Sequence, residues 1–293
     1  MAAPTQMIAE KVTAWFTSAA RQLPWRASDT DAWGVLVSEV MLQQTPVARV
    51  LPVYQMWMRR WPKPAALAAS SPGDAVRAWG KLGYPRRALR LHECAVVIEA
   101  RFGGVVPDTV DELLTLPGIG SYTARAIAAF AYGQRQPVVD TNVRRVIARS
   151  VEGNGEAAPP SSARDHAAAL ALLPADPRIA ARTSAALMEL GALICTARAP
   201  RCDACPIASN CAWLAAGRSA YTGRATNPQR FAGTDRQVRG LLLDVLRASH
   251  KPVTAAQLRA TWSDAVQRDR ALASLLADGL VEPLPRNRFA LPG

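Results

Sequence analysis

The chain has 293 residues, with 35 Lys or Arg against 23 Asp or Glu, a formal net charge of +12. Apolar residues make up 49% and charged residues 20%, which excludes a largely disordered chain, and no apolar run is long enough to predict a transmembrane helix. The charge excess favours a polyanionic partner, although an arginine-rich composition alone gives the same balance. The N-terminal residues lack the apolar segment of a signal peptide, so we expect a cytoplasmic protein.

Helices are predicted for the first two thirds of the chain. Ala, Leu, Arg and Glu recur there at helical spacing, and alternating β-branched runs are almost absent. Pairs of Gly and Pro interrupt the pattern often enough to limit each helix to about 8–16 residues. Two such helices are predicted over 87–101 and 121–132, and the polar segment 152–162 is predicted to be an exposed loop.

Another helix is predicted over residues 33–45, and Pro46 stops it. Val35, Glu39 and Leu42 fall on one face of this helix, so Glu39 interrupts an apolar stripe. A carboxyl in apolar surroundings has a raised pKa and can donate a proton near neutrality. The alternative is a glutamate at the edge of the stripe that reaches solvent or an arginine, and the helix alone favours that alternative.

A helix–turn–helix segment surrounds the sequence LPGIG at residues 116–120. Thr109 and Glu112 have the spacing of a capping box at the start of its first helix. Gly118 and Gly120 allow a tight turn whose N–H groups, followed by a helix N-terminus, can cradle a phosphate. A short Gly-x-Gly is common in helix connections, so this motif alone does not establish a function.

Asp140 directly precedes a predicted helix that begins at Thr141. The default interpretation is an N-cap, where the helix dipole favours the ionised carboxylate. One neutral acid, for which Glu39 is the candidate, and one anionic carboxylate are the pair that cleavage of a glycosidic bond requires.

Four of the five cysteines lie within residues 195–211 and have the spacing C-x6-C-x2-C-x5-C. This clustering predicts a metal centre in a reducing compartment and argues against disulfides. Structural zinc sites usually pair two short Cys-x2–4-Cys segments, and only one such segment is present here. Iron–sulfur clusters, in contrast, use four thiolates. Zinc remains the alternative. The ligand candidates are Cys195, Cys202, Cys205 and Cys211, while the separate Cys94 is expected to be a small core residue.

The C-terminal part changes in composition after residues 218–234, which are rich in Gly, Ser, Pro and Arg and are typical of a linker. A helix is predicted over 236–248, a short helix opens at Thr254, and a third helix ends near 278–279. A terminal hairpin follows. Three helices and a hairpin predict a small winged-helix-like module over 235–293.

Taken together, residues 10–216 resemble the MutY-type adenine DNA glycosylases, in the endonuclease III/MutY branch of the helix-hairpin-helix-GPD superfamily. The resemblance is strongest to actinobacterial (mycobacterial) members. It is carried by LPWR (23–26), VSEVMLQQT (37–45), LPGIGSYTA (116–124), VVDTNVRRV (138–146), MELGALIC (188–195) and the cysteine loop (195–211).

This resemblance implies a mainly α, two-lobed helix-hairpin-helix glycosylase fold with a [4Fe–4S] cluster. The expected domains are a six-helix barrel with the hairpin (28–136), a cluster domain (1–27 and 137–217), a linker (218–234) and the winged-helix-like domain (235–293).

The resemblance also implies catalytic roles. Glu39 would protonate adenine N7 and then assist water, and Asp140 would stabilise the sugar cation or form a transient adduct. Tyr122 would support this centre, and Asn142 would bind the catalytic water or Asp140. The positions that match the adenine pocket, or that enter the duplex beside the mispair, are Trp25, Arg26, Leu42, Gln43, Gln44 and Glu189. The expected DNA phosphate contacts are Gly118, Gly120, Arg144, Arg198 and Arg201.

Three departures from the family pattern, or from its endonuclease III branch, affect the expected specificity. Tyr122 stands where the endonuclease III branch has a lysine, so no strong strand-cutting lyase activity is expected. After Tyr84, Pro85 replaces the tyrosine that wedges beside the damaged guanine in many members. No NUDIX-like domain is recognisable, so lesion recognition rests on the core or on a tail carrying Arg236, Arg239 and Arg247.

The expected activity is monofunctional hydrolytic removal of adenine mispaired with 8-oxoguanine or guanine. Its expected partner is duplex DNA that contains these mispairs, and the protein is expected to be a monomer associated with the nucleoid. The alternatives are an endonuclease III-like pyrimidine glycosylase with AP lyase activity and a non-catalytic protein that binds mismatched DNA.

Overall fold

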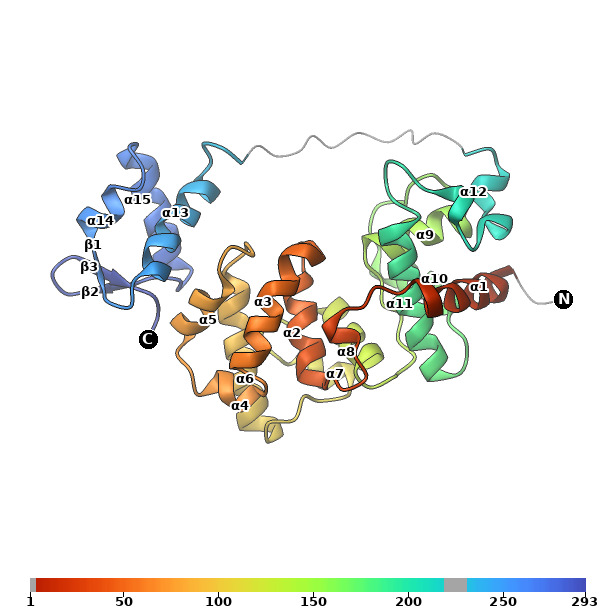
Figure 1. The fold of residues 1–293 in the computed structure, drawn as a ribbon, viewed down its shortest axis with the longest axis horizontal. Coiled ribbons are helices and arrows are strands. Elements are labelled where there is room, and N and C mark those ends of the chain that lie inside the picture. The colour runs from red at the N-terminus through yellow and green to blue at the C-terminus, as the bar shows by residue number, and fades with distance from the viewer. Residues whose placement is uncertain (1–3, 219–230) are drawn as a thin grey trace. The chain divides into compact units, whose positions relative to one another are not determined.

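The computed structural model describes residues 4–218 and 231–293, so residues 219–230 of the predicted linker lie outside the described residues. The fold is mainly helical, as predicted, with three short strands in the C-terminal part (Figure 1). In the part of the chain that the structure describes, no helix has the length and apolar character needed to span a membrane.

By its internal contacts the chain divides into two compact units. The first contains the described residues within 1–35, 108–114 and 119–225, and the second those within 36–107, 115–118 and 226–293. This division differs from the predicted domain boundaries. In particular α8, which the prediction assigned to the barrel, packs against α11 and belongs to the first unit.

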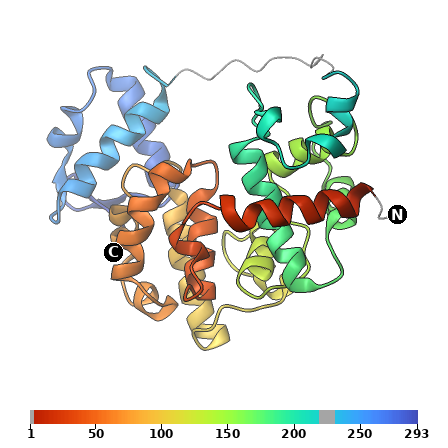
Figure 2. The ribbon, with the colours of Figure 1, turned by 45° about the vertical axis from the view of Figure 1, so that its right-hand side comes forward.

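The first unit is built around α1, α9 and α11. Its helices are α1 (Pro4–Ala19), α7 (Val110–Leu114), α8 (Ser121–Phe130), α9 (Thr141–Ser150), α10 (Ser162–Leu172), α11 (Pro177–Leu193) and α12 (Ala212–Ala215), with single 3-10 turns at η1 (Pro24–Arg26), η2 (Cys202–Ala204) and η3 (Ala208–Asn210). Ile8 and Val12 of α1 pack with Val146 of α9 and Leu190 of α11 in one buried cluster. Figure 2 shows α1, in red, crossing α11, in green.

The second unit has a core of tryptophans. Its helices are α3 (Val47–Arg60), α4 (Pro64–Ala68), α5 (Pro72–Trp79), α6 (Arg86–Phe102), α13 (Asp235–Ala248), α14 (Ala255–Arg259) and α15 (Ala265–Ala277). The ring of Trp57 meets that of Trp61 edge-on at 4.5 Å and that of Trp79 at 5.8 Å. All three rings are at most 2% exposed, so their burial dominates the stability of this unit.

The α2 helix (Ala32–Leu42) begins in the first unit and runs into the second. Every residue from Trp33 to Met41 is buried, so the helix has no solvent-facing side over this stretch, unlike the single apolar stripe that was predicted. It also ends three residues earlier than predicted, because the chain turns at Gln44, whose φ of 53° is left-handed.

The C-terminal module has the predicted three helices and hairpin. Thr254 caps α14 through a capping box with Gln257, as the sequence indicates. The strands β1 (Val253–Thr254), β2 (Glu282–Leu284) and β3 (Arg288–Ala290) form an antiparallel sheet in the order β1-β3-β2. Arg286 and Asn287 turn the hairpin with positive φ at both positions, which matches the twist of the strands that they join.

Candidate active site and cluster pocket

Asp140 is the N-cap of α9, as predicted. Its Oδ1 accepts the N–H of Val143 at 2.7 Å, and its Oδ2 accepts Nδ2 of Asn142 at 2.8 Å. Burial raises the pKa of Asp140, and these hydrogen bonds and the nearby Arg145 offset only part of that shift. The hydrogen bonds at the helix start favour the anion, as predicted, while the loss of solvent around the carboxyl opposes them.

Asn142 is held in turn by Arg145. The Nη2 of Arg145 donates to Oδ1 of Asn142 and to the carbonyl oxygen of Gly191, both at 2.8 Å, and its Nε donates to the carbonyl oxygen of Cys195 at 2.7 Å. A continuous chain of hydrogen bonds therefore joins the Asp140 carboxylate to the first cysteine of the loop.

Gly191 allows α11 to approach α9 at this point. A Cβ on Gly191 would lie 2.6 Å from Cβ of Asn142 and 2.9 Å from its carbonyl oxygen, far inside van der Waals contact. The lack of a side chain at position 191 is therefore required for the observed crossing of the two helices.

Glu39 lies on α2 and is 5% exposed. The alternative in which this carboxyl reaches solvent is therefore wrong, while the alternative in which it reaches an arginine stays a prediction. Tyr122 lies on α8 and packs against Ala126, Val138 and Ala181, so its ring is supported by the small apolar cluster beneath it.

Glu189 is completely buried on α11 and is held by two arginines. It accepts Nε and Nη2 of Arg21 at 2.7 Å each and Nη2 of Arg26 at 3.0 Å. Burial alone would raise the pKa of Glu189, but the hydrogen bonds from the two arginines outweigh it and lower the pKa to about 2. Sequence reasoning missed Arg21, because nothing in the local sequence marks it as the partner of a residue 168 positions away.

Arg26 faces this carboxylate from η1, next to the buried Trp25. Its guanidinium lies over the ring of Phe16, 5.3 Å from the centroid. Its Nη1 is buried and has no hydrogen-bond partner among the described residues. A buried donor without an acceptor is costly, so a ligand acceptor at this position would be stabilised.

The end of α2 and the loop before α6 bring together the residues predicted to enter the duplex. Gln43, Gln44, Tyr84 and Pro85 line one open groove together with Gly118. Gln44 and Tyr84 have φ values of 53° and 47°, a conformation that is strained for residues other than glycine and is common at functional sites.

Arg87 fixes this arrangement from α6. Its guanidinium donates to the carbonyl oxygens of Val40, Met41 and Gln43, which are left unpaired where α2 ends, at 2.5–3.1 Å. Burial lowers the pKa of Arg87 to about 10. This residue was predicted only as part of a general positive charge, whereas it caps a helix.

The two hairpin glycines differ in backbone conformation and in the space around them. Gly118 has a φ of +79°, and a Cβ there would lie 2.8 Å from Cβ of Arg90. Gly120 has an extended conformation and an open surrounding, and it is the N-cap of α8, where its carbonyl oxygen accepts the N–H of Ala124 at 2.9 Å. The first N–H groups of α8 are thus at the start of a helix, where an anion is stabilised.

The three arginines predicted to contact phosphate differ in their surroundings. The Nε of Arg144 donates to Oδ2 of Asp165 at 2.9 Å, and its side chain is 17% exposed. Arg201 donates to the carbonyl oxygen of Leu193 at 2.6 Å, while Arg198 is exposed. The guanidinium of Arg144 is therefore engaged inside its own unit, whereas Arg198 and Arg201 are both exposed.

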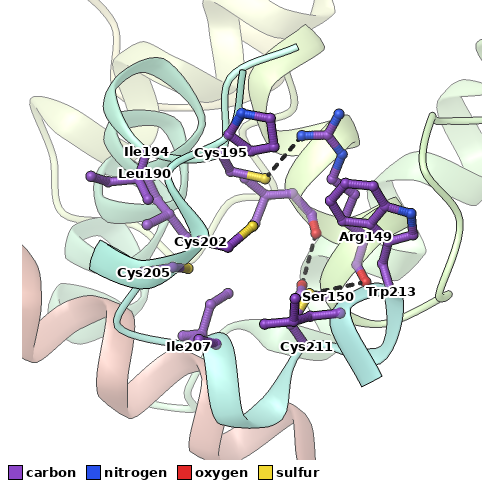
Figure 3. A pocket seen from close by; sticks show the side chains of 14 residues that line it. Arg149, Ser150, Leu190, Ile194, Cys195, Cys202, Cys205, Ile207, Cys211 and Trp213 are labelled. Atoms are coloured by element: carbon purple, nitrogen blue, oxygen red, sulfur yellow. Dashed lines mark hydrogen bonds between the residues drawn. The ribbon is translucent and has the colours of Figure 1, made fainter. Parts of the chain in front are cut away.

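The four loop cysteines line one pocket, which Figure 3 shows from close by. The remaining lining is mainly apolar, from residues such as Leu190, Ile194 and Ile207. Arg149 closes one side, and its Nη1 donates to Sγ of Cys195 at 3.5 Å and to the carbonyl oxygen of Thr196 at 2.8 Å. Its guanidinium stacks 4.6 Å from the ring of Trp213.

The donor set fits a cluster better than a single ion. Among the residues that the structure describes, no three His, Cys, Asp or Glu side chains form a group that could hold one metal ion, and a zinc ion requires sulfur at about 2.3 Å. A four-iron cluster spreads its four thiolates around a larger body. Burial raises the pKa of Cys205 to about 11, so iron binding must displace the proton of this thiol.

Sequence reasoning missed Arg149, although α9 contains one signal. Arg149 interrupts a buried stretch formed by Val146, Ile147 and Ser150, and a buried arginine requires several acceptors. Its acceptors are the loop carbonyl oxygens beside the cysteines.

Comparisons with known proteins agree with this geometry. Residues 37–168 match the HhH-GPD superfamily of base excision DNA repair proteins, and residues 195–211 match the iron-sulfur binding domain of endonuclease III. The chain is 57% identical to an adenine DNA glycosylase of Mycobacterium tuberculosis, covering 99% of this chain and 95% of that protein. It is 60% identical to one of Mycolicibacterium smegmatis, covering 97% and 95%. A solved thermostable thymine-DNA glycosylase superposes with a TM-score of 0.64 at 25% identity, covering 73% of this chain and 97% of that one.

Proposed function

Because the chain belongs to the adenine DNA glycosylases of the HhH-GPD superfamily, we propose that it hydrolyses the N-glycosidic bond of adenine mispaired with 8-oxoguanine or guanine in duplex DNA. The chain is a base excision repair enzyme that carries a [4Fe–4S] cluster. The observation that best supports the proposed chemistry is the pair of carboxyls, one on the buried α2 and one at the start of α9.

In the proposed reaction, Glu39 gives a proton to the leaving adenine, and its carboxylate then takes a proton from the water that adds to the sugar carbon. Departure of the base leaves positive charge on the sugar, and the Asp140 carboxylate stabilises that charge. Asn142 holds the carboxylate in place through its 2.8 Å hydrogen bond, so Asp140 does not need to reorganise during the reaction. Tyr122 supports the same centre and has no amine with which to form a Schiff base, so the enzyme is monofunctional.

Adenine must leave the base stack before its glycosidic bond can be reached. We propose Trp25, Arg26, Leu42 and Glu189 as residues that contact the extruded base. The unsatisfied Nη1 of Arg26 supports this role, because a ring nitrogen of the purine would supply its missing acceptor. Glu189 holds Arg26 in the required orientation.

The cluster would be held by Cys195, Cys202, Cys205 and Cys211. When bound, it cross-links the loop between them through four thiolates. The loop then presents Arg198 and Arg201, and together with Gly118 and Gly120 we propose these as contacts to DNA phosphates. We also propose that the protein acts as a monomer and is located on the nucleoid.

A single-turnover assay with adenine opposite 8-oxoguanine, guanine, cytosine or thymine tests the proposed function. We expect free adenine from the first two duplexes and much slower release from the others. Glu39→Gln should reduce the rate by at least about a thousandfold while retaining DNA binding, because only the transferable proton is lost. Glu93→Gln, on the exposed side of α6, is the matched control.

Two outcomes would point to the alternatives. A borohydride-trapped adduct on duplexes with oxidised pyrimidines would indicate a pyrimidine glycosylase with lyase activity. Tight binding of the mispair without release of any base would indicate a non-catalytic binding protein.

A further inference from the structure

The groove of the second unit extends well beyond the residues assigned above. It is open, and it is lined on one side by the end of α2, residues 80–87 and the hairpin residues Pro117 and Gly118. Its other side is formed by α13 and the residues that precede it. The C-terminal module is therefore a wall of the same groove that contains Gln43, Gln44 and Tyr84.

The lining of this groove is strongly basic. Two aspartates, Asp244 and Asp278, face eight cationic side chains, which are Arg49, Lys81, Arg86, Arg87, Arg90, Arg236, Arg239 and Arg247. Lys81 and Arg86 keep 84% and 59% of their side chains exposed in spite of their ion pairs with the aspartates. A groove of this charge fits the phosphate backbone of the duplex DNA on which the enzyme acts.

Two aromatic side chains stand in the groove as well. Phe231 is 60% exposed and precedes α13, and Tyr84 is 52% exposed on the opposite wall. Large aromatic rings exposed next to cations are typical of surfaces that contact sugars and bases.

The module is fixed to α5 by a reciprocal exchange of arginines. The Nη1 of Arg77 donates to the carbonyl oxygens of Leu246, Arg247 and Ser249 at the end of α13. In return, Nε of Arg247 donates to the carbonyl oxygen of Val76 near the end of α5, at 3.1 Å. Each helix end thus receives a cation from the other helix.

A second contact joins the C-terminal residues of the module to the first turn of α5. The N–H of Gly73, in the first turn of α5, donates to the carbonyl oxygen of Pro292 at 2.7 Å. A Cβ on Gly73 would clash with that oxygen and lie 3.0 Å from Cβ of Leu291. The last residues of the module are therefore packed directly on the backbone of α5.

This docking changes which arginines of the module can contact DNA. Arg247 is occupied by α5 and Asp244, and Arg239 donates to the side chains of Ser274 and Asp278. Of the three arginines that were candidates for lesion recognition, Arg236 is the exposed one. An arginine that contacts a DNA phosphate contributes affinity, but it gives no information about the identity of the base.

We propose that residues 231–293 form a fixed wall of the DNA groove, in which Arg236 contacts a phosphate and Phe231 packs on the adjoining deoxyribose. The wall adds affinity that does not depend on the base opposite adenine. This inference rests on duplex DNA being the substrate of the enzyme, and it adds a binding surface to the proposed function.

Fluorescence anisotropy at several salt concentrations tests the inference, with duplexes whose target adenosine carries a 2′-fluoro group that resists hydrolysis. Arg236→Ala should raise Kd by about 3- to 10-fold, equally for adenine opposite 8-oxoguanine and opposite cytosine, and should lower the salt slope by about 1. Phe231→Ala should raise Kd similarly without changing the slope. Arg259→Ala removes an exposed arginine from the same module, outside the groove, and should change neither.

The inference is overturned if Arg236→Ala and Phe231→Ala, like Arg259→Ala, leave Kd and the salt slope at the values of the unmodified protein. An effect confined to the 8-oxoguanine duplex would instead indicate that the module recognises the lesion. Gly73→Ala provides an independent check, because it displaces the module without removing a cation and should give the loss seen for Arg236→Ala. A thermal unfolding curve verifies that this variant is folded. The two proposals can fail separately. If the unmodified protein releases no adenine, the proposed function fails, whereas the Kd values and salt slopes still test whether residues 231–293 contact DNA.

Discussion

In the cysteine pocket, Arg149 is 3% exposed and directs its donors at carbonyl oxygens and a sulfur of its own unit. In the groove of the second unit, Lys81 and Arg86 leave most of their side chains in water. Cationic side chains thus have different surroundings in the two regions. In the pocket, Arg149 satisfies the hydrogen-bond acceptors of a loop, whereas in the groove Lys81 and Arg86 leave their charge exposed to solvent.

This difference separates two effects of removing an arginine. In the pocket the loss leaves buried carbonyl oxygens without donors, so it should appear in the stability of the protein and of the cluster. For exposed groove residues such as Lys81 and Arg86 the loss leaves no buried group unpaired, so it should appear in DNA affinity and its salt dependence.

The largest expected effect is in the pocket. Arg149→Ala removes the donors to Thr196, Ala197 and Cys195 and the stacking on Trp213, and should lower the free energy of unfolding by about 3–5 kcal/mol. We also expect reduced iron content and faster loss of the cluster absorbance. Iron analysis and denaturant unfolding measure both effects. Arg178→Ala, at an exposed position of the same unit, should leave both unchanged, and a cluster that survives Arg149→Ala intact would contradict the structural role.

The second prediction concerns the buried ion pairs of Glu189. Its pKa is lowered from 4.5 to about 2, so the stabilisation that it provides is complete above pH 4.5 and is lost as the pH falls toward 2. Between pH 5 and pH 3.5 the protein should therefore lose about 1 kcal/mol more of its unfolding free energy than Glu189→Gln does. Urea unfolding at the two pH values measures this difference. Parallel pH dependences of the protein and the variant would mean that the arginines do not favour the carboxylate.

The smallest expected effect distinguishes two arginines of the cysteine loop. Arg198→Ala should weaken duplex binding by about threefold and lower the salt slope by about 1, without affecting iron content. Arg201→Ala should also reduce cluster stability, because Arg201 donates to the carbonyl oxygen of Leu193. Anisotropy titrations and iron analysis on both variants separate the two roles. A change of opposite-base preference in either variant would show that the loop does more than bind phosphate.

Features that depend on a few neighbouring residues could be predicted from the sequence. Asp140 and Thr254 cap the helices that they precede, and the predicted terminal hairpin is present, with its turn at 285–287. The cysteine spacing was also sufficient to predict one shared pocket, because all four residues come from one short loop. Such features are local, and their geometry follows from the chain itself.

Features that depend on long-range packing could not be predicted. Arg144 meets Asp165 and Arg239 meets Asp278 only because helices distant in sequence pack together. The pKa of Asp140 has the same dependence, since its direction is decided by burial and not by its place on the helix. The completely buried α2 likewise depends on neighbours that surround it, which a helical pattern does not reveal.

Gly191 has only a hydrogen atom for a side chain, and this affects the position of Asp140, the carboxylate proposed to stabilise the sugar cation. Because this glycine touches the backbone and Cβ of Asn142, the thickness of α11 at residue 191 acts as a spacer for the first turn of α9. Any larger residue would push that turn, and Asp140 with it, away from α11. A residue with no functional group, two positions from the buried Glu189, therefore restricts the geometry around Asp140.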